Sequence, residues 1–246
     1  MAFEIGLSGQ MFDNYSIWDH LMAAADFCYK SVELRSTHVN PSCSREELDR
    51  IKDFLLAKKL KVNCLSCFTG NYGLLSDAEC NEAFNVFKEY IKLTVFFECE
   101  MMRVWPAWQE SSAASSEVWE RAAKWMKKSC EYAAEYDKKL VMEMHHGTLC
   151  DSVDSSLKLL NMINHDNAGV TLDPVNLYQV PADYSYESIK KLGSRIFNVH
   201  IKDIIELPSN SYPYCFEYSY YMQHIGRFKK VMPPRNKQER FFPTGG

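Results

Sequence analysis

Seven short apolar segments recur along the chain, and longer segments with helical patterning separate them. Their starts lie about 27 to 40 residues apart, which is the length that a strand, a crossover helix and two loops need for parallel pairing. This alternation predicts a parallel α/β fold, not antiparallel hairpins. The predicted strands are Glu4–Ser8, Ser31–Arg35, Lys61–Phe68, Met101–Trp105, Leu140–Met144, Ala168–Asp173 and Ile196–His200.

The segments between these strands carry helix signals. Ser44 can cap a helix that runs to about Lys59, because Glu47 follows three residues later as in a capping box. Other segments place apolar residues three and four positions apart, so that one helical face can pack on a sheet. These further helices are predicted over Glu79–Lys92, Glu117–Tyr136 and Tyr186–Leu192.

Parallel strands that alternate with helices form either a closed barrel or an open doubly wound sheet. No Gly-rich phosphate loop follows the first strand, which favours a (β/α)8 TIM-type barrel. Such a barrel needs eight strands, but Ile204–Gly246 is rich in Tyr, Pro and polar residues without a convincing strand and helix. We therefore expect an α/β barrel that lacks the eighth βα unit in this chain, as a single, C-terminally incomplete domain over residues 1–246.

Composition excludes several classes of partner. The formal net charge is −4 with both signs mixed along the chain, so a nucleic-acid partner is not expected. The nine cysteines are odd in number and irregularly spaced, which is typical of a cytoplasmic protein and not of a disulfide framework. No export signal and no apolar run of about 18 residues occurs, so no membrane contact is expected.

Three polar residues close three successive late strands: Glu143, Asp173 and His200. In a parallel barrel all carboxyl strand ends open on one face, so these side chains can converge on one divalent metal ion. Two carboxylates and an imidazole suit Mn²⁺, Co²⁺, Mg²⁺ or Zn²⁺. Each residue alone could equally cap a strand or bond a helix end, but equivalent positions on consecutive strands favour the metal site.

The sequence around these residues resembles a known family. Met-Glu-Met-His-His-Gly-Thr-Leu at 142–149, Leu-Asp-Pro-Val-Asn at 172–176 and Val-His-Ile-Lys-Asp at 199–203 look like successive strand-end motifs of the xylose isomerase-like TIM barrel superfamily. Its members include sugar phosphate isomerases and epimerases, dehydratases and AP endonucleases. The resemblance implies that Glu143, Asp173 and His200 bind the metal and that Glu143 also moves a proton. The family's fourth ligand, a glutamate ending strand eight, is not found in this chain.

Residues beside these motifs complete the expected site. Every second residue of a strand points to the same face, so His145 should share the face of Glu143 and Lys202 the face of His200. We expect both to orient substrate oxygens or stabilise charge. Asn176 stands where several relatives have a histidine that contacts substrate. The alternatives are a surface ion pair for Lys202 and a loop amide that satisfies backbone groups for Asn176.

Glu33, Arg103 and Trp105 lie at or near the ends of earlier strands and are expected to bind substrate. For Glu33 and Arg103 a salt bridge, even with each other, is the competing explanation. For Trp105 it is packing in the core or rim.

The expected reaction is isomerisation or epimerisation of a sugar, sugar phosphate or keto-acid through a metal-stabilised enediolate. A related dehydratase acting on a polyol or keto-sugar, or a catalytically inactive barrel that binds sugar or metal, remains an alternative. The expected partner is therefore a small molecule, with a homo-oligomer possible because an unfinished barrel exposes strand edges.

Overall fold

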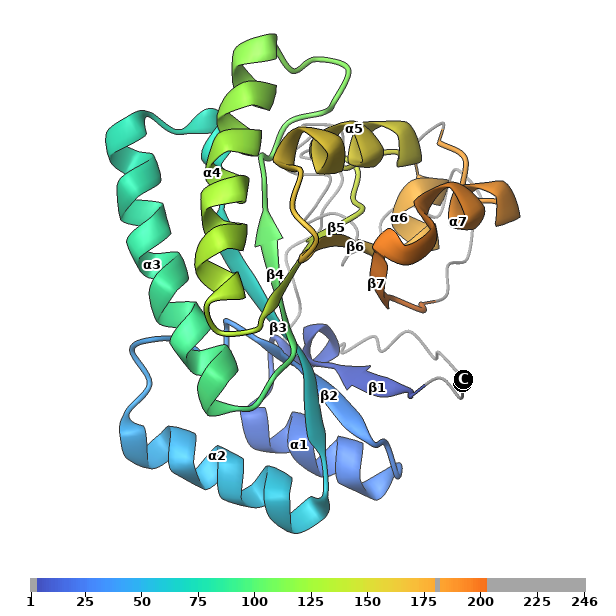
Figure 1. Ribbon diagram of the computed structural model, residues 1–246. Coiled ribbons are helices and arrows are strands. Elements are labelled where there is room, and N and C mark those ends of the chain that lie inside the picture. The colour runs from blue at the N-terminus through green and yellow to red at the C-terminus, as the bar shows by residue number, and fades with distance from the viewer. Residues whose placement is uncertain (1–3, 180–181, 203–246) are drawn as a thin grey trace, which may run out of the picture. The chain divides into compact units, whose positions relative to one another are not determined.

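A computed structural model describes residues 4–179 and 182–202. Its strands form one seven-stranded sheet in the order β1-β2-β3-β4-β5-β6-β7, and each neighbouring pair is parallel (Figure 1). This confirms the predicted parallel α/β alternation. The strands are β1 (Gly6–Ser8), β2 (Ser31–Arg35), β3 (Lys61–Gly70), β4 (Met101–Trp105), β5 (Lys139–Glu143), β6 (Ala168–Leu172) and β7 (Ile196–Val199).

All seven predicted segments contain a strand, and the differences lie at their ends. The first strand begins at Gly6 instead of Glu4, where pairing with Ser31 of β2 begins. The third continues beyond Phe68 to Gly70, which pairs with Trp105 of β4 after a register shift. Gly70 has a φ of +110°, a conformation that residues with a side chain rarely adopt.

Seven α-helices connect the strands in the described residues. The hydroxyl of Ser44 accepts a hydrogen bond from Glu47 N at 3.2 Å, as expected for a helix N-cap. Three helices were not predicted, over Ile17–Asp26, Val153–Ile163 and Pro174–Tyr178, although Ser16 and Ser152 begin capping boxes that could have revealed the first two. The helices are α1 (Ile17–Asp26), α2 (Arg45–Lys58), α3 (Asp77–Phe96), α4 (Ser116–Ala134), α5 (Val153–Ile163), α6 (Pro174–Tyr178) and α7 (Tyr186–Leu192).

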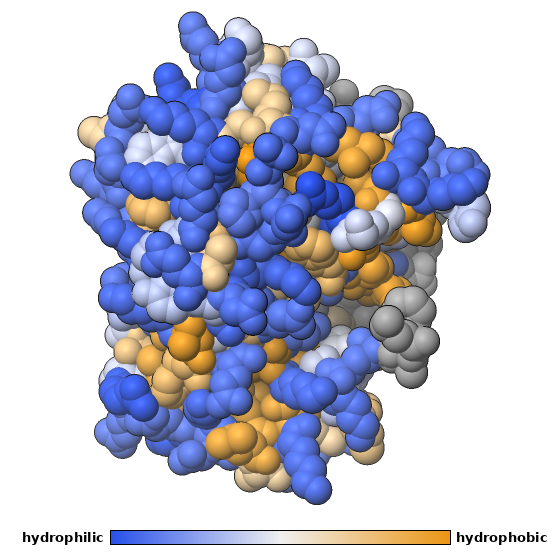
Figure 2. Space-filling model, in the orientation of Figure 1, coloured by the Kyte–Doolittle hydropathy of each residue, from blue (hydrophilic) through white to orange (hydrophobic). Residues whose placement is uncertain are grey.

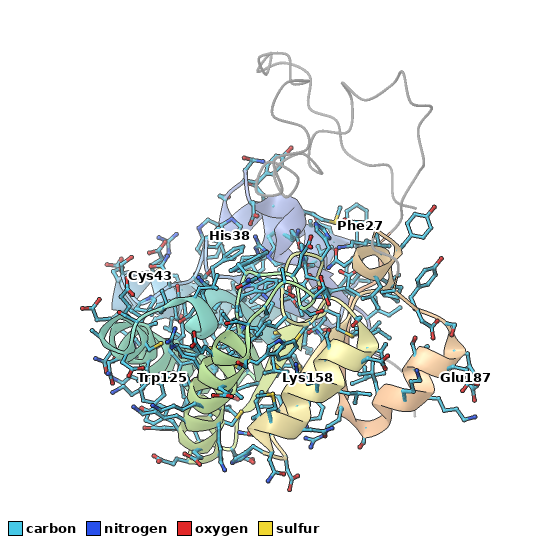
Figure 3. All side chains as sticks on the ribbon, turned by 90° about the horizontal axis from the view of Figure 1, so that it is seen from above. Phe27, His38, Cys43, Trp125, Lys158 and Glu187 are labelled. Atoms are coloured by element: carbon cyan, nitrogen blue, oxygen red, sulfur yellow. The ribbon has the colours of Figure 1, made fainter. Side chains whose placement is uncertain are left out.

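The helices cover the outer face of the sheet and present polar side chains to solvent, which Figure 2 shows over α3 and α4. Neighbouring helices also contact each other: Nζ of Lys158 of α5, which Figure 3 labels, lies 3.8 Å from the ring centroid of Trp119 of α4. None of the helices in the described ranges is long and apolar enough to cross a membrane.

Strand β2 shows how the fold creates a polar interior. All five of its residues are buried, and Val32 and Leu34 belong to the hydrophobic core. Alternate residues of a strand point to opposite faces, so Glu33 and Arg35 share the other face. Parallel strands covered by helices have their outer face in the apolar core, which leaves the inner face for the polar groups of a site.

The sheet curls as a TIM barrel does. Glu33 in β2 hydrogen-bonds His200 beyond β7, although these strands lie near opposite ends of the strand order. The expected absence of an eighth unit concerns residues 204–246, which lie outside the described residues. Contacts divide the chain into two units, Met1–His200 and Ile201–Gly246, and the single domain over 1–246 stays a prediction.

Candidate metal centre

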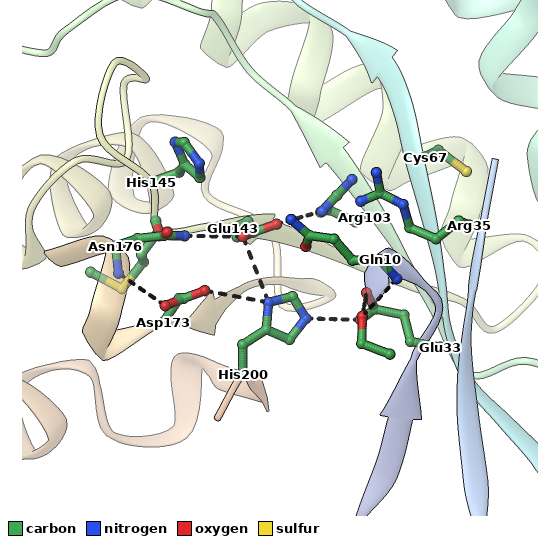
Figure 4. Close-up of polar contacts among 12 residues, drawn as sticks. Gln10, Glu33, Arg35, Cys67, Arg103, Glu143, His145, Asp173, Asn176 and His200 are labelled. Atoms are coloured by element: carbon green, nitrogen blue, oxygen red, sulfur yellow. Dashed lines mark hydrogen bonds and ion pairs between the residues drawn. The ribbon is translucent and has the colours of Figure 1, made fainter. Parts of the chain in front are cut away.

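Glu143, Asp173 and His200 converge at the carboxyl ends of β5, β6 and β7 (Figure 4). Glu143 is the last residue of β5, while Asp173 and His200 directly follow β6 and β7. One potential ligand atom from each residue lies within 4.8 Å of the other two. The structure thus brings together three residues that are far apart in the sequence.

The separations between these atoms suit a divalent ion. His200 Nδ1 lies 3.6 Å from Glu143 Oε1 and 3.6 Å from Asp173 Oδ2, which is too long for a normal hydrogen bond. Ligand atoms at 2.0 to 2.2 Å from a tetrahedral ion are about 3.3 Å apart. A small inward movement would therefore let all three atoms bind one ion, and the donor set of two carboxylates and one imidazole fits such an ion.

Burial and charge determine how these groups ionise. Burial alone raises the pKa of Glu143, but the charges of Arg103 and His200 outweigh it and hold that pKa well below its usual range. Burial alone lowers the pKa of His200, but Glu33, Asp173 and Glu143 raise it well above its usual value. A metal ion that binds His200 must therefore displace a proton.

Arg103 and Glu143 form a buried ion pair. Arg103 Nη1 lies 2.5 Å from Glu143 Oε2, and both side chains are almost fully buried. The Arg103 guanidinium also lies over the ring of Trp105, with its Cζ 4.7 Å from the ring centroid. The salt bridge that sequence analysis considered between Arg103 and Glu33 is thus replaced by bonds from Arg103 to Glu143 and from His200 to Glu33.

Asn176 links two of the candidate ligands. Its Nδ2 donates to Glu143 Oε1 at 3.1 Å and to Met144 O at 3.2 Å. Its backbone N–H donates to Asp173 Oδ1 at 3.0 Å, so Asp173 also caps α6. The amide group of Asn176 therefore donates to Glu143 and can position it, while substrate binding by Asn176 stays a prediction.

His145 lies beside the centre (Figure 4), and its catalytic role stays a prediction. Strand β5 ends at Glu143, so strand parity does not extend to His145. The buried ring instead meets Trp105 and Trp108 edge-on, with centroid distances of 5.7 and 5.6 Å. Its Nδ1 lies 2.6 Å from His146 O. His145 and the two indoles thus form an aromatic wall next to Glu143.

Two further residues, Lys202 and Arg35, lie outside the set of candidate metal ligands. Lys202 belongs to the unit that begins at Ile201, so the structure does not relate it to the centre, and its catalytic role stays a prediction. Arg35 was missed in the sequence, although strand alternation from Glu33 points to it. It binds Asp13 through Nε at 3.1 Å and Nη2 at 2.7 Å and lies over the ring of Phe68.

Comparison with known proteins shows several relatives. A curated protein, 3-dehydroshikimate dehydratase from Bacillus anthracis, is 24% identical over 208 residues, which cover 82% of this chain and 70% of that protein. The crystal structure of the probable 3-DHS dehydratase AsbF from the same organism has a TM-score of 0.73 at 21% identity and covers 94% of this chain and 91% of that one.

Two other solved structures are similar in fold. The IOLI protein with a bound zinc atom has a TM-score of 0.72 at 19% identity, covering 84% of this chain and 75% of that one. A D-psicose 3-epimerase has a TM-score of 0.72 at 11% identity, covering 94% and 83%. The family model described as xylose isomerase-like TIM barrel matches residues 21–224. On this match, and with the parallel curled sheet, the chain belongs to the xylose isomerase-like TIM barrel family.

Proposed function

We propose that this protein is a divalent-metal-dependent isomerase or epimerase that acts on a sugar, sugar phosphate or keto-acid. The convergence of Glu143, Asp173 and His200 within 4.8 Å carries the proposal. The relatives support it, because they include sugar epimerases and a protein with bound zinc. Mn²⁺, Co²⁺, Mg²⁺ and Zn²⁺ are all compatible with this donor set.

The ion would supply a positive charge that stabilises negative charge on a substrate oxygen beside the carbon that loses a proton. Glu143 is the group that takes and returns this proton. Arg103 and Asn176 hold one oxygen each of its carboxylate, so its direction toward the substrate is set before binding.

The aromatic wall of Trp105, Trp108 and His145 keeps water from this position. The indole Nε1–H of Trp105 is buried, with no hydrogen-bond partner among the described residues. A substrate hydroxyl or carbonyl oxygen would satisfy this donor, which supports Trp105 as a substrate-binding residue.

A dehydratase is the second candidate. The curated relative and the AsbF structure, which spans most of this chain, both carry dehydratase names. A dehydratase would use the same base and the same ion but expel a hydroxyl group as water after proton removal. A third candidate, a binding protein without turnover, would bind the ion and form no product.

The test is turnover of metal-free protein reloaded with each of the four ions, on a panel of ketoses, their phosphates, keto-acids and 3-dehydroshikimate. An isomerised product supports the first proposal, and loss of water supports the dehydratase. Glu143→Gln should lower kcat by about 100-fold or more, because a positioned base contributes about 10² to 10⁴. The exposed Glu46→Gln is the control. Activity of Glu143→Gln within about tenfold of the wild type removes Glu143 from the mechanism.

A further inference from the structure

Glu33 makes a contact that the proposed reaction does not explain. It lies in the middle of β2, is 4% exposed, and precedes His200 by 167 positions. Its Oε2 nevertheless lies 2.9 Å from His200 Nε2, so the bond joins strands near the two ends of the curled sheet (Figure 4). A carboxylate buried at this depth is costly unless it is paired.

His200 is the close partner of this carboxylate. Two longer bonds also reach Glu33: Ser8 Oγ donates to Oε1 at 3.4 Å and Asn198 Nδ2 donates to Oε2 at 3.5 Å. Both oxygens of Glu33 thus already accept hydrogen bonds from the protein. The short bond to His200 is the basis for assigning Glu33 a role in orienting that ring, and substrate binding by Glu33 stays a prediction.

The His200 ring has two nitrogens that face different groups. Nε2 faces Glu33, while Nδ1 faces Glu143 Oε1 and Asp173 Oδ2, each 3.6 Å away. A neutral imidazole carries a proton on one nitrogen and a lone pair on the other. A hydrogen bond from Nε2–H to Glu33 therefore leaves the lone pair of Nδ1 directed at the two carboxylates.

We infer that Glu33 is a positioning residue for the proposed metal centre: it accepts the Nε2–H of His200 and thereby makes Nδ1 the metal-binding atom. This inference rests on the proposed function. A carboxylate behind a ligating histidine fixes the tautomer and the ring orientation and makes the imidazole a better ligand. Glu33 does so from β2, on the other side of the barrel interior, so affinity for the ion depends on the curl of the sheet.

Two substitutions separate the hydrogen bond from the charge. Glu33→Gln keeps an oxygen that accepts the Nε2–H bond but removes the negative charge, and Glu33→Leu removes both. Loss of such a partner typically weakens metal binding by 10- to 100-fold. We expect the Kd for Zn²⁺, measured by competition with a chromophoric chelator, to rise about tenfold in Glu33→Gln and about 100-fold in Glu33→Leu. Ser8→Ala is the matched control, because it removes the hydroxyl that donates to Glu33 Oε1 and leaves the Glu33–His200 bond in place. Its Kd for Zn²⁺ should stay within about twofold of wild type.

The tautomer of His200 provides a readout that a merely structural role would not change. Long-range ¹H–¹⁵N spectra of the Zn²⁺-loaded protein, assigned with His200→Asn, should show a protonated Nε2 and a metal-bound Nδ1 in the wild type and in Glu33→Gln. Glu33→Leu should show both tautomers. Circular dichroism and Tm on the same samples establish that each variant is folded, and Glu33→Gln alone carries the test if Glu33→Leu does not fold.

Wild-type Zn²⁺ binding with an unchanged Kd in a folded Glu33→Gln overturns the inference and leaves the proposed function intact. A wild-type spectrum with Zn²⁺ on Nε2 also overturns the inference alone. Failure of the wild type to bind any of the four ions overturns the proposed function and the inference with it.

Discussion

Lowering the pH should destabilise this protein through His20 of α1. His20 is fully buried, its Nε2–H donates to Leu7 O of β1 at 3.1 Å, and its ring stacks on Phe12 with centroids 5.0 Å apart. Its Nδ1 has no hydrogen-bond partner among the described residues. Burial lowers the pKa of His20 from 6.5 to about 4, because the charged ring would lose its hydration.

The sign and size of the effect follow from this difference in pKa. Between about pH 6.5 and pH 4 the unfolded chain carries a proton on His20 and the folded chain does not. The free energy of unfolding therefore falls as the pH drops through that window. At about 1.4 kcal/mol for each pKa unit, the full loss is about 3.5 kcal/mol. The stability is fully present above about pH 6.5, where both states are neutral.

Urea unfolding followed by circular dichroism, at pH values from about 7 down to about 4.5, measures this loss. His20→Gln keeps a side-chain N–H for Leu7 O but cannot titrate, so its free energy of unfolding should fall less steeply with pH than that of the wild type. The difference between the two proteins cancels the contributions of all other titrating groups. Parallel pH dependences in wild type and His20→Gln would refute the reasoning.

Two further predictions concern the centre and the sheet. Asn176→Ala removes the donors to Glu143 Oε1 and Met144 O. Loss of a residue that holds a metal ligand in place typically weakens metal binding by 10- to 100-fold, so the Kd for Zn²⁺ in chelator competition should rise about tenfold. An unchanged Kd contradicts the positioning role. Gly70→Ala should lower the free energy of unfolding by about 2 kcal/mol or more, because a Cβ at a φ of +110° would collide with Trp105 O. Urea titration measures this loss, and a loss below about 0.5 kcal/mol would contradict the prediction.

The three candidate ligands could be found in the sequence because their convergence depends on topology alone. Glu143, Asp173 and His200 each lie at or directly after the end of one strand of a parallel series, and parallel strands present their carboxyl ends on one face. The rule does not need side-chain conformations or the curvature of the sheet. Alternation along a strand is a weaker guide beyond the strand end. Because β5 ends at Glu143, alternation does not determine which way His145 points.

The sequence by itself determined the order of the strands and the polar residues at the strand ends, because hydrophobic periodicity and the spacing between strands are read from local segments of the chain. Only the tertiary structure decided which charges meet. Arg103 pairs with Glu143 instead of Glu33, and Glu33 meets His200 from a distant strand, because the curl of the sheet and the packing of side chains select among contacts that are equally compatible with the sequence pattern.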